Sequence, residues 1–185
     1  DGIIRSIRRI SYINIRIPLT NSIDCTEILD YIALRNYSCG LLVISAPGAG
    51  KTTLLRSLAD GLSSPPHSRR VSVIDTNQEL MIAEYRNSLI DLFSGYPKAD
   101  GISIATRYFN PQYIICDELG TSLETKAICE TLNTGVPNIA SAHAFDLSDG
   151  QTRQNLAILL EKQVFDAVIQ IIPSENEHVY KIIEL

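Results

Sequence analysis

Residues 41–53, LLVISAPGAGKTT, join a run of apolar residues to a glycine-rich loop that ends in Lys-Thr. The apolar run 40–45 predicts a buried strand, and residues 51–60 after the loop predict a helix. Glycines let the backbone of such a loop wrap so that successive N–H groups point inward, and the helix adds its positive N-terminal end. We therefore expect the loop to bind phosphate groups.

The polar residues of the loop have distinct expected roles. Lys51 is expected to reach the β- and γ-phosphates of a nucleotide, Thr52 to bind Mg²⁺ through its hydroxyl, and Thr53 to contact the α-phosphate. The pattern G-x-x-x-x-G-K-[ST] has glycine where this chain has Ser45, and serine is small, so the departure is modest. The predicted nucleotide-binding residues are Ser45, Ala46, Pro47, Gly48, Ala49, Gly50, Lys51, Thr52 and Thr53.

Two acidic residues close the apolar run YIIC further along the chain. Asp117 is expected at the carboxyl end of a buried strand, where sheets of this kind bind ligands, and is a candidate Mg²⁺ ligand. Glu118 is the candidate base that activates a water for attack on the γ-phosphate. A base beside the magnesium carboxylate suits hydrolysis, whereas a small-molecule kinase mostly needs water excluded. The sequence has no Asn-Lys-x-Asp segment, which would recognise a guanine base, so ATP is expected rather than GTP.

Other strand ends also carry polar residues. Asp75 ends the run VSVI and Glu79 follows four residues later, so both are candidate Mg²⁺ ligands; a strand-end aspartate can also simply cap a turn. Ser141 and His143 end the predicted strand after that of Asp117, and His143 could sense the γ-phosphate.

Two arginines are candidates for stabilising the charge of a phosphoryl transition state. Arg107 lies ten residues before Asp117, and Arg153 lies near the start of a late predicted helix. Arginines more often face solvent, and the sequence alone leaves both alternatives open.

Composition and charge restrict the class of protein. The chain has 185 residues, of which 45% are hydrophobic and 20% charged, as in a soluble globular domain. No apolar run approaches the roughly 20 residues that span a bilayer. Residues 1–16 hold four arginines and one aspartate, whereas the rest of this chain of net charge −5 is acidic. Nucleic-acid binding is therefore not expected, although the basic segment could touch an acidic partner or a neighbouring subunit.

The cysteines indicate a reducing environment. Cys25, Cys39, Cys116 and Cys129 are widely scattered, and none forms a C-x-x-C pair. Cys116 and Cys129 lie in apolar patterns, so buried free thiols are expected there. A cytoplasmic setting without a zinc site follows.

Strands that alternate with helical segments predict an α/β fold with a mainly parallel sheet and helices on both faces. Residues 76–96 are expected to form a long functional loop. Since the chain starts with Asp rather than Met, we expect a basic arm or linker strand over residues 1–20, left from a longer N-terminal region, and one domain over 21–185. The predicted strands are 12–17, 40–45, 70–75, 112–118 and 136–143; the helices are 25–36, 51–60, 98–109, 123–134 and 150–162; 165–172 and 177–185 form an antiparallel hairpin.

Several segments in order resemble the stage III sporulation protein AA family over residues 7–172, namely INIRI, ISAPGAGKTTLLRSLA, VIDTNQELMIA, GYPKADG, RYFNPQYIICDELG and GVPNIASAHAFD. The resemblance implies a RecA-like P-loop NTPase domain, similar to the ring-forming ATPases of type II and type IV secretion, that uses ATP and Mg²⁺. It further implies a hexamer that powers a channel between mother cell and forespore, docked on membrane proteins of that channel at the mother-cell cytoplasmic side.

The resemblance also suggests roles for individual residues. Secretion ATPases carry Glu-Thr shortly after their second acidic motif, where this chain has Glu124 and Thr125, and their signature histidine and upstream arginine correspond to His143 and Arg107. The sporulation family usually reads Asp-Glu-Arg where this chain has Asp-Thr-Asn at 75–77, so no catalytic arginine is carried over there. The leading hypothesis is an ATP-hydrolysing motor; a nucleotide-dependent assembly scaffold and a small-molecule kinase are the alternatives.

Overall fold

The computed structural model describes residues 22–80, 89–172 and 179–185, in which seven strands form one sheet of order β3-β2-β4-β5-β1-β6-β7. All neighbouring strands run parallel except β6 and β7, which pair antiparallel. The strands are β1 (Leu41–Ser45), β2 (Val71–Asp75), β3 (Ile90–Ser94), β4 (Tyr113–Glu118), β5 (Asn138–His143), β6 (Ala167–Ile172) and β7 (Val179–Glu184).

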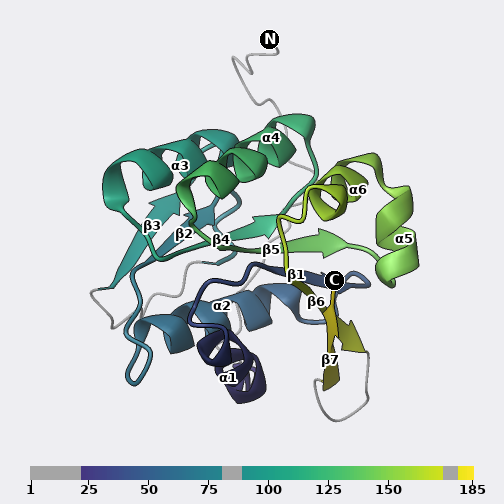
Figure 1. Ribbon diagram of the computed structural model, residues 1–185, viewed down its shortest axis with the longest axis horizontal. Helices are drawn as coiled ribbons and strands as arrows, with labels where there is room; N and C mark the ends of the chain where they lie inside the picture. Colours follow the sequence, from purple (N-terminus) through teal and green to yellow (C-terminus); the bar gives the residue numbers. More distant parts are fainter. Residues whose placement is uncertain (1–21, 81–88, 173–178) are drawn as a thin grey trace, which may run out of the picture.

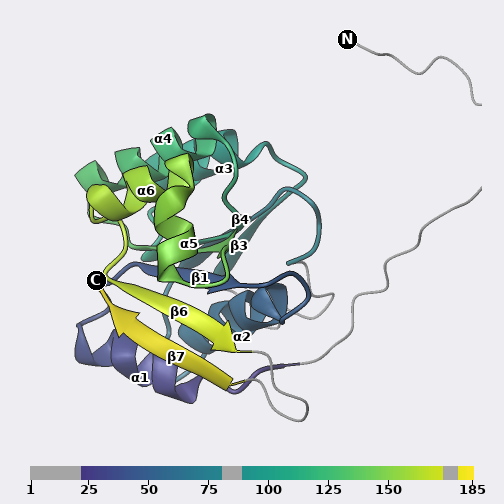
Figure 2. The same cartoon turned by 90° about the vertical axis from the view of Figure 1, so that its right-hand side faces the viewer.

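Helices cover both faces of this sheet. In Figure 1, α1 and α2 lie below the sheet, and α3, α4 and α6 lie above it. Figure 2 shows the β6–β7 hairpin from the side, with α1 beneath it. The expected α/β class, parallel sheet and C-terminal hairpin are thus confirmed. The helices are α1 (Thr26–Leu34), α2 (Lys51–Ser63), α3 (Lys98–Ile104), α4 (Ser122–Thr131), α5 (Leu147–Thr152) and α6 (Gln154–Glu161).

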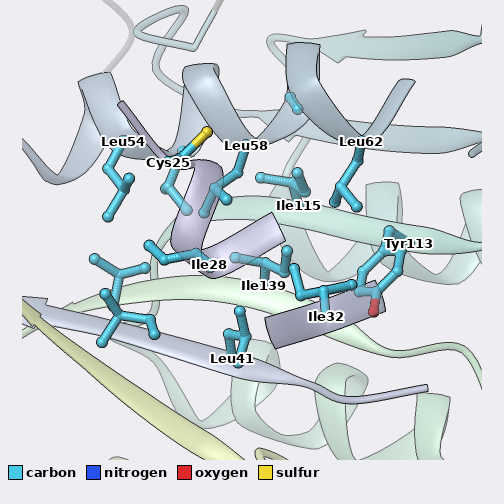
Figure 3. Packing of buried hydrophobic residues seen from close by; sticks show 14 of the residues in the cluster. Cys25, Ile28, Ile32, Leu41, Leu54, Leu58, Leu62, Tyr113, Ile115 and Ile139 are labelled. Atoms are coloured by element: carbon cyan, nitrogen blue, oxygen red, sulfur yellow. The ribbon is translucent and has the colours of Figure 1, made fainter. Parts of the chain in front are cut away.

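The core explains why the central strands are apolar throughout. Successive side chains of a strand point to opposite faces, and both faces of β1 are covered. Leu41 therefore packs in the cluster formed with α1 and α2, and Leu42 in the cluster formed with α3, α4 and α6. Figure 3 shows the first cluster, where Leu58 of α2 and Ile28 of α1 meet the sheet. Burying one such side chain contributes about 1.5–3 kcal/mol.

The strand order determines which residues meet at the carboxyl edge of the sheet. β5 lies between β1 and β4, and it pairs with both in parallel. Ser45 of β1 is opposite His143 of β5, and Glu118 of β4 is opposite Ser141. The register between β4 and β5 shifts between Cys116 and Glu118, which is a β-bulge at Asp117. Bulges of this kind redirect side chains, and they are frequent beside active sites.

Several element predictions were wrong in detail. Within the expected loop 76–96 the structure has strand β3, which pairs with β2 on one side only and whose burial is incomplete, so its residues lack a strong apolar pattern. The single helix expected over 150–162 is two helices, because Asp146 caps an earlier start of α5 and Arg153 has an extended backbone. The helix expected over 98–109 is confirmed in its extent, although its second part, Ala105–Phe109, is a π-helical turn after α3.

The remaining sequence expectations have mixed outcomes. The strand expected over 12–17 lies outside the described residues. Cys116 is fully buried as predicted, whereas Cys129 is only half-buried. Among the residues that the structure describes, no helix has the length and apolar character needed to cross a membrane.

A close backbone approach at the start of β1 gives the first prediction. A Cβ on Gly40 would lie 2.7 Å from the carbonyl oxygen of Val164 and 3.3 Å from that of Asn138. Because backbone atoms cannot move aside without disturbing the sheet, Gly40→Ala should lower the free energy of unfolding by about 1–3 kcal/mol, measured by urea denaturation. Gly120→Ala is the matched control, since a Cβ there meets nothing within 4 Å. Equal stability of the two variants would contradict the prediction.

Candidate functional site

The loop over residues 46–50 connects β1 to α2 and has the backbone conformation that glycine favours. Gly48 has φ of 77° and Gly50 has φ of 101°, both in the left-handed region that other residues rarely adopt. Gly50 is the N-cap of α2, a helix of 13 residues. Free N–H groups at such a terminus, together with the helix dipole, favour an anionic ligand.

Lys51, the first residue of α2, folds back over this loop. Its Nζ lies 3.2 Å from the carbonyl oxygen of Ser45, 3.3 Å from that of Ala46 and 2.9 Å from Nδ1 of His143. Burial lowers the pKa of Lys51, and the carboxylate of Glu118 acts in the opposite direction. The loop therefore places a lysine side chain beside its own backbone and the end of β5.

His143 connects Lys51 to the acidic end of β4. Its Nε2 lies 3.0 Å from Oε2 of Glu118, while its Nδ1 faces Lys51. Since the lysine ammonium can only donate, Nδ1 accepts from Lys51 and Nε2–H donates to Glu118. Lys51, His143 and Glu118 thus form one continuous chain of polar contacts, made possible by the position of β5 between β1 and β4.

Asp117 lies beside Lys51, His143 and Glu118 and is buried. Its Oδ1 is 2.7 Å from Nζ of Lys98, and its Oδ2 accepts a hydrogen bond from Nδ2 of Asn77 at 3.4 Å. Burial raises the pKa of Asp117; Lys98 opposes this effect, and the charges of Asp75 and Glu79 add to it. The carboxylate is therefore held by specific partners in a region dense in acidic groups.

Lys98 was missed by the sequence reasoning, which used its segment only as a family resemblance. The available signal was a lysine directly after Pro97 in the first turn of a predicted helix, where the helix dipole disfavours a cation. Its contact with Asp117 joins residues 19 positions apart in the sequence, and therefore depends on the packing of α3 against α4 and β2.

The start of α4 positions a second carboxylate near Lys98. Oε2 of Glu124 accepts the N–H groups of Gly120 and Thr121, each at 2.9 Å, and Oγ1 of Thr121 accepts the N–H of Glu124 at 3.3 Å. This is a capping box. Although burial alone would raise it, the pKa of Glu124 is lowered by these hydrogen bonds and by Lys98. Oε1 of Glu124 lies 3.7 Å from Nζ of Lys98.

A cavity of about 600 Å³ brings most of the predicted site residues together. The predicted magnesium ligand Asp75 is not among the residues that line it: Asp75 is fully buried, and its Oδ1 accepts the N–H of Glu79 at 2.8 Å, as in a turn cap. The lining residues are Pro47, Gly48, Gly50, Lys51, Thr52, Thr53, Asn77, Glu79, Asp117, Glu118, Ser141 and His143.

The two candidate arginines lie outside this cavity. Arg107 is exposed in the π-helical turn before β4, at the opposite end of that strand, and lines a separate cavity of about 460 Å³. Arg153 pairs with Asp149 at 3.1 Å and lines a hollow of about 280 Å³ next to Pro47 and His143. Within one chain, Arg153 is therefore close to the glycine-rich loop and Arg107 is distant from it.

The oxygen groups around the cavity fit Mg²⁺ bound together with a phosphate ligand. Thr52 contributes a hydroxyl, and Asp117 and Glu79 contribute carboxylates. Within the described ranges, no group of three or more His, Cys, Asp or Glu side chains could hold a metal ion. Mg²⁺ is usually bound by one or two carboxylates plus substrate phosphates and waters, so this set suits it.

This arrangement of a glycine-rich loop after β1 and an acidic end of β4, with β5 between them, is that of the RecA-like P-loop fold. The fold is similar to the ATPase DotB of Legionella pneumophila, with a TM-score of 0.64 and 21% identity over 85% of this chain and 47% of that one. It is also similar to the VirB11 ATPase of the Brucella suis type IV secretion system, with a TM-score of 0.63 and 20% identity over 86% and 53% of the two chains.

The amino-acid sequence assigns the chain to a specific family. The family described as sporulation stage III, protein AA, matches residues 2–182, and the chain belongs to this family, as the resemblance predicted. It is 31% identical over 180 residues to Stage III sporulation protein AA of Bacillus subtilis (strain 168), covering 92% of this chain and 58% of that protein. It is also 31% identical over 176 residues to Protein SEEDLING PLASTID DEVELOPMENT 1 of Arabidopsis thaliana, covering 86% and 25%. The chain thus spans less than two thirds of either relative.

The capping box at α4 gives a second prediction. Thr121→Val keeps the size of the side chain but removes the hydroxyl that accepts the N–H of Glu124. Loss of such a cap should lower the free energy of unfolding by about 1 kcal/mol, measured by thermal or urea denaturation. Ser122→Ala, at the exposed neighbouring position, should be close to neutral. A Thr121 variant as stable as the Ser122 variant would show that the cap is unimportant.

Proposed function

We propose that this chain is the ATPase domain of a ring-shaped motor that drives a secretion-type membrane channel, by family the mother cell–forespore channel of endospore formation. The observation that carries this proposal is the contact chain Lys51–His143–Glu118 beside Asp117, within one cavity next to the phosphate loop. Family membership and the fold shared with secretion ATPases support it.

ATP binding is assigned to the loop and its immediate neighbours. Loop N–H groups and Lys51 hold the β- and γ-phosphates, and Thr53 contacts the α-phosphate. Thr52 and Asp117 would hold Mg²⁺, with Glu79 at the cavity wall. Bound there, Mg²⁺ would neutralise phosphate charge.

Hydrolysis is assigned to Glu118 acting on a water molecule. The carboxylate takes a proton from the water while the water oxygen forms a bond to the γ-phosphorus. At the same time, the bond between that phosphorus and the β–γ bridging oxygen breaks. His143 contacts both Lys51 and Glu118, so a change in the phosphate group near Lys51 is transmitted to the base. His143 therefore serves as the sensor that couples the two.

These roles predict that one substitution reduces ATP turnover and that another weakens ATP binding. Glu118→Gln should retain ATP binding but reduce turnover by at least about 10²-fold, because the proton acceptor is lost. Lys51→Ala should weaken binding of ATP itself. Binding is measured by titration calorimetry and turnover by phosphate release, with Glu161→Gln, on the exposed end of α6, as the charge-matched control.

The outcomes also separate the competing functions. Turnover of Glu118→Gln at the parent rate would contradict the assignment of the base. Tight ATP binding by the parent with negligible turnover, even when assembled, would instead support a nucleotide-dependent scaffold. Turnover seen only after addition of a phosphoryl acceptor would support a kinase.

The exposed position of Arg107 supports a site completed between subunits. Within its own chain Arg107 is far from the cavity, so we place it at the nucleotide of a neighbouring subunit in a hexameric ring. Arg153 lies beside the loop and is the candidate for a contribution within the same chain. The basic segment 1–20 is proposed to contact a neighbour or an acidic partner, with the ring on the cytoplasmic face of the mother-cell membrane.

Shared sites predict complementation between inactive variants. Turnover per subunit of the parent should rise steeply with protein concentration. An equal mixture of Lys51→Ala and Arg107→Ala subunits should regain up to about a quarter of the parent turnover, because that fraction of randomly formed interfaces has both intact residues. Turnover independent of concentration, or no recovery in a mixture shown by sedimentation to co-assemble, would contradict an action of Arg107 on its neighbour.

A further inference from the structure

Lys98 occupies an unusual position at the start of α3. Only 6% of the residue is exposed, and its Nζ lies 2.7 Å from Oδ1 of Asp117 and 3.7 Å from Oε1 of Glu124. The same ammonium group donates a hydrogen bond to the backbone carbonyl of Glu118. One side chain thus contacts both acidic residues at the end of β4 and the first turn of α4.

The position is unfavourable for a lysine unless these contacts compensate for it. A cation in the first turn of a helix opposes the helix dipole, and burial of an ammonium group is costly without hydrogen-bonded partners. Burial alone would lower the pKa of Lys98, but Cys116, Asp117 and Glu124 outweigh this effect and raise it. The side chain is therefore charged, and its partners are the carboxylates of the site.

We propose that Lys98 is a positioning residue of the ATPase site: it fixes Asp117 and the Glu118 backbone at the β-bulge and weakens the attraction of Asp117 for a divalent cation. The inference rests on the proposed function, because it assigns Asp117 to the metal and Glu118 to the base.

Both effects follow from the contacts of the ammonium group. The bulge at Asp117 frees the end of β4 from regular pairing with β5, and the bond from Lys98 to the Glu118 carbonyl fixes the backbone there. That backbone directs the Glu118 side chain toward His143. Meanwhile Oδ1 of Asp117 is already neutralised by Lys98, so the charge that Asp117 offers to a cation in the cavity is reduced.

The test compares Mg²⁺ dependence in four proteins: parent, Lys98→Met, Asp117→Asn and the double variant. Fluorescent N-methylanthraniloyl-ADP is bound at fixed concentration and MgCl₂ is titrated. Removal of the positive charge should lower the Mg²⁺ concentration at half-maximal binding by about tenfold, given the strength of charge interactions at these distances. In the Asp117→Asn background the same change at Lys98 should have no effect, because the carboxylate is gone.

Turnover of ATP should move in the opposite direction from metal affinity. Lys98→Met should reduce kcat by about tenfold or more while its KM for ATP changes much less, since Glu118 is misdirected and the phosphate loop is intact. Lys98→Arg retains the charge and should keep a Mg²⁺ midpoint nearer to the parent than Lys98→Met does. A residue with only a structural role would reduce turnover without strengthening Mg²⁺ binding.

Each result is decisive. An unchanged or raised Mg²⁺ midpoint in Lys98→Met would overturn the inference while leaving ATP binding by the parent intact. If the parent itself binds the fluorescent ADP no better than Lys51→Ala does, the proposed function fails instead. If Lys98→Met does not fold, we compare Asp117→Asn with the double variant, because neither leaves an unpaired charge at position 117. Different Mg²⁺ midpoints for these two proteins would overturn the inference.

Discussion

The contact between Nζ of Lys51 and Nδ1 of His143, 2.9 Å long, joins two elements that lie 92 residues apart in the chain. It exists because β5 lies between β1 and β4, and because the parallel direction of all three strands brings their carboxyl ends to one edge. A sheet with β1 and β4 adjacent would place Lys51 beside the acidic pair with no residue between them. The inserted strand therefore provides the position from which a histidine can contact both Lys51 after the glycine-rich loop and Glu118 at the end of β4.

The site is organised around two cations that burial keeps close to their partners. In the described part of the chain, Lys51 and Lys98 are the buried lysines, with exposed fractions of 8% and 6%. Buried ion pairs often add little net stability compared with apolar packing, because desolvation offsets the attraction. The contacts of Lys98 with Asp117 and Glu124 are therefore better explained by the geometry they impose on the end of β4 than by stability.

Local patterns in the sequence were sufficient for the elements that carry most of the site. Three patterns depend only on neighbouring residues: the glycine spacing before Lys51, the apolar run before Asp117 and the alternation of strands with helices. The structure has the elements that these patterns predict. Edge strand β3 was missed because it is defined by pairing with β2, and the contact of Lys98 because it depends on the packing of α3. Likewise, no local signal shows that Asp75 is turned away from the cavity toward the N–H of Glu79.

Burial divides the acidic pair into a fixed and a movable member. Asp117 is 5% exposed, and withdrawing it from Lys98 would leave an unpaired buried charge, at a cost of about 3–5 kcal/mol. The side chains of Glu118 and His143 are 50% and 35% exposed, and a hydrogen bond between them contributes only about 0.5–1.5 kcal/mol. Glu118 can therefore exchange its contact with His143 for one with water at little cost, while Asp117 stays in place. Under the proposed function, the movable residue is the base, Glu118, and the fixed residue is the metal ligand, Asp117.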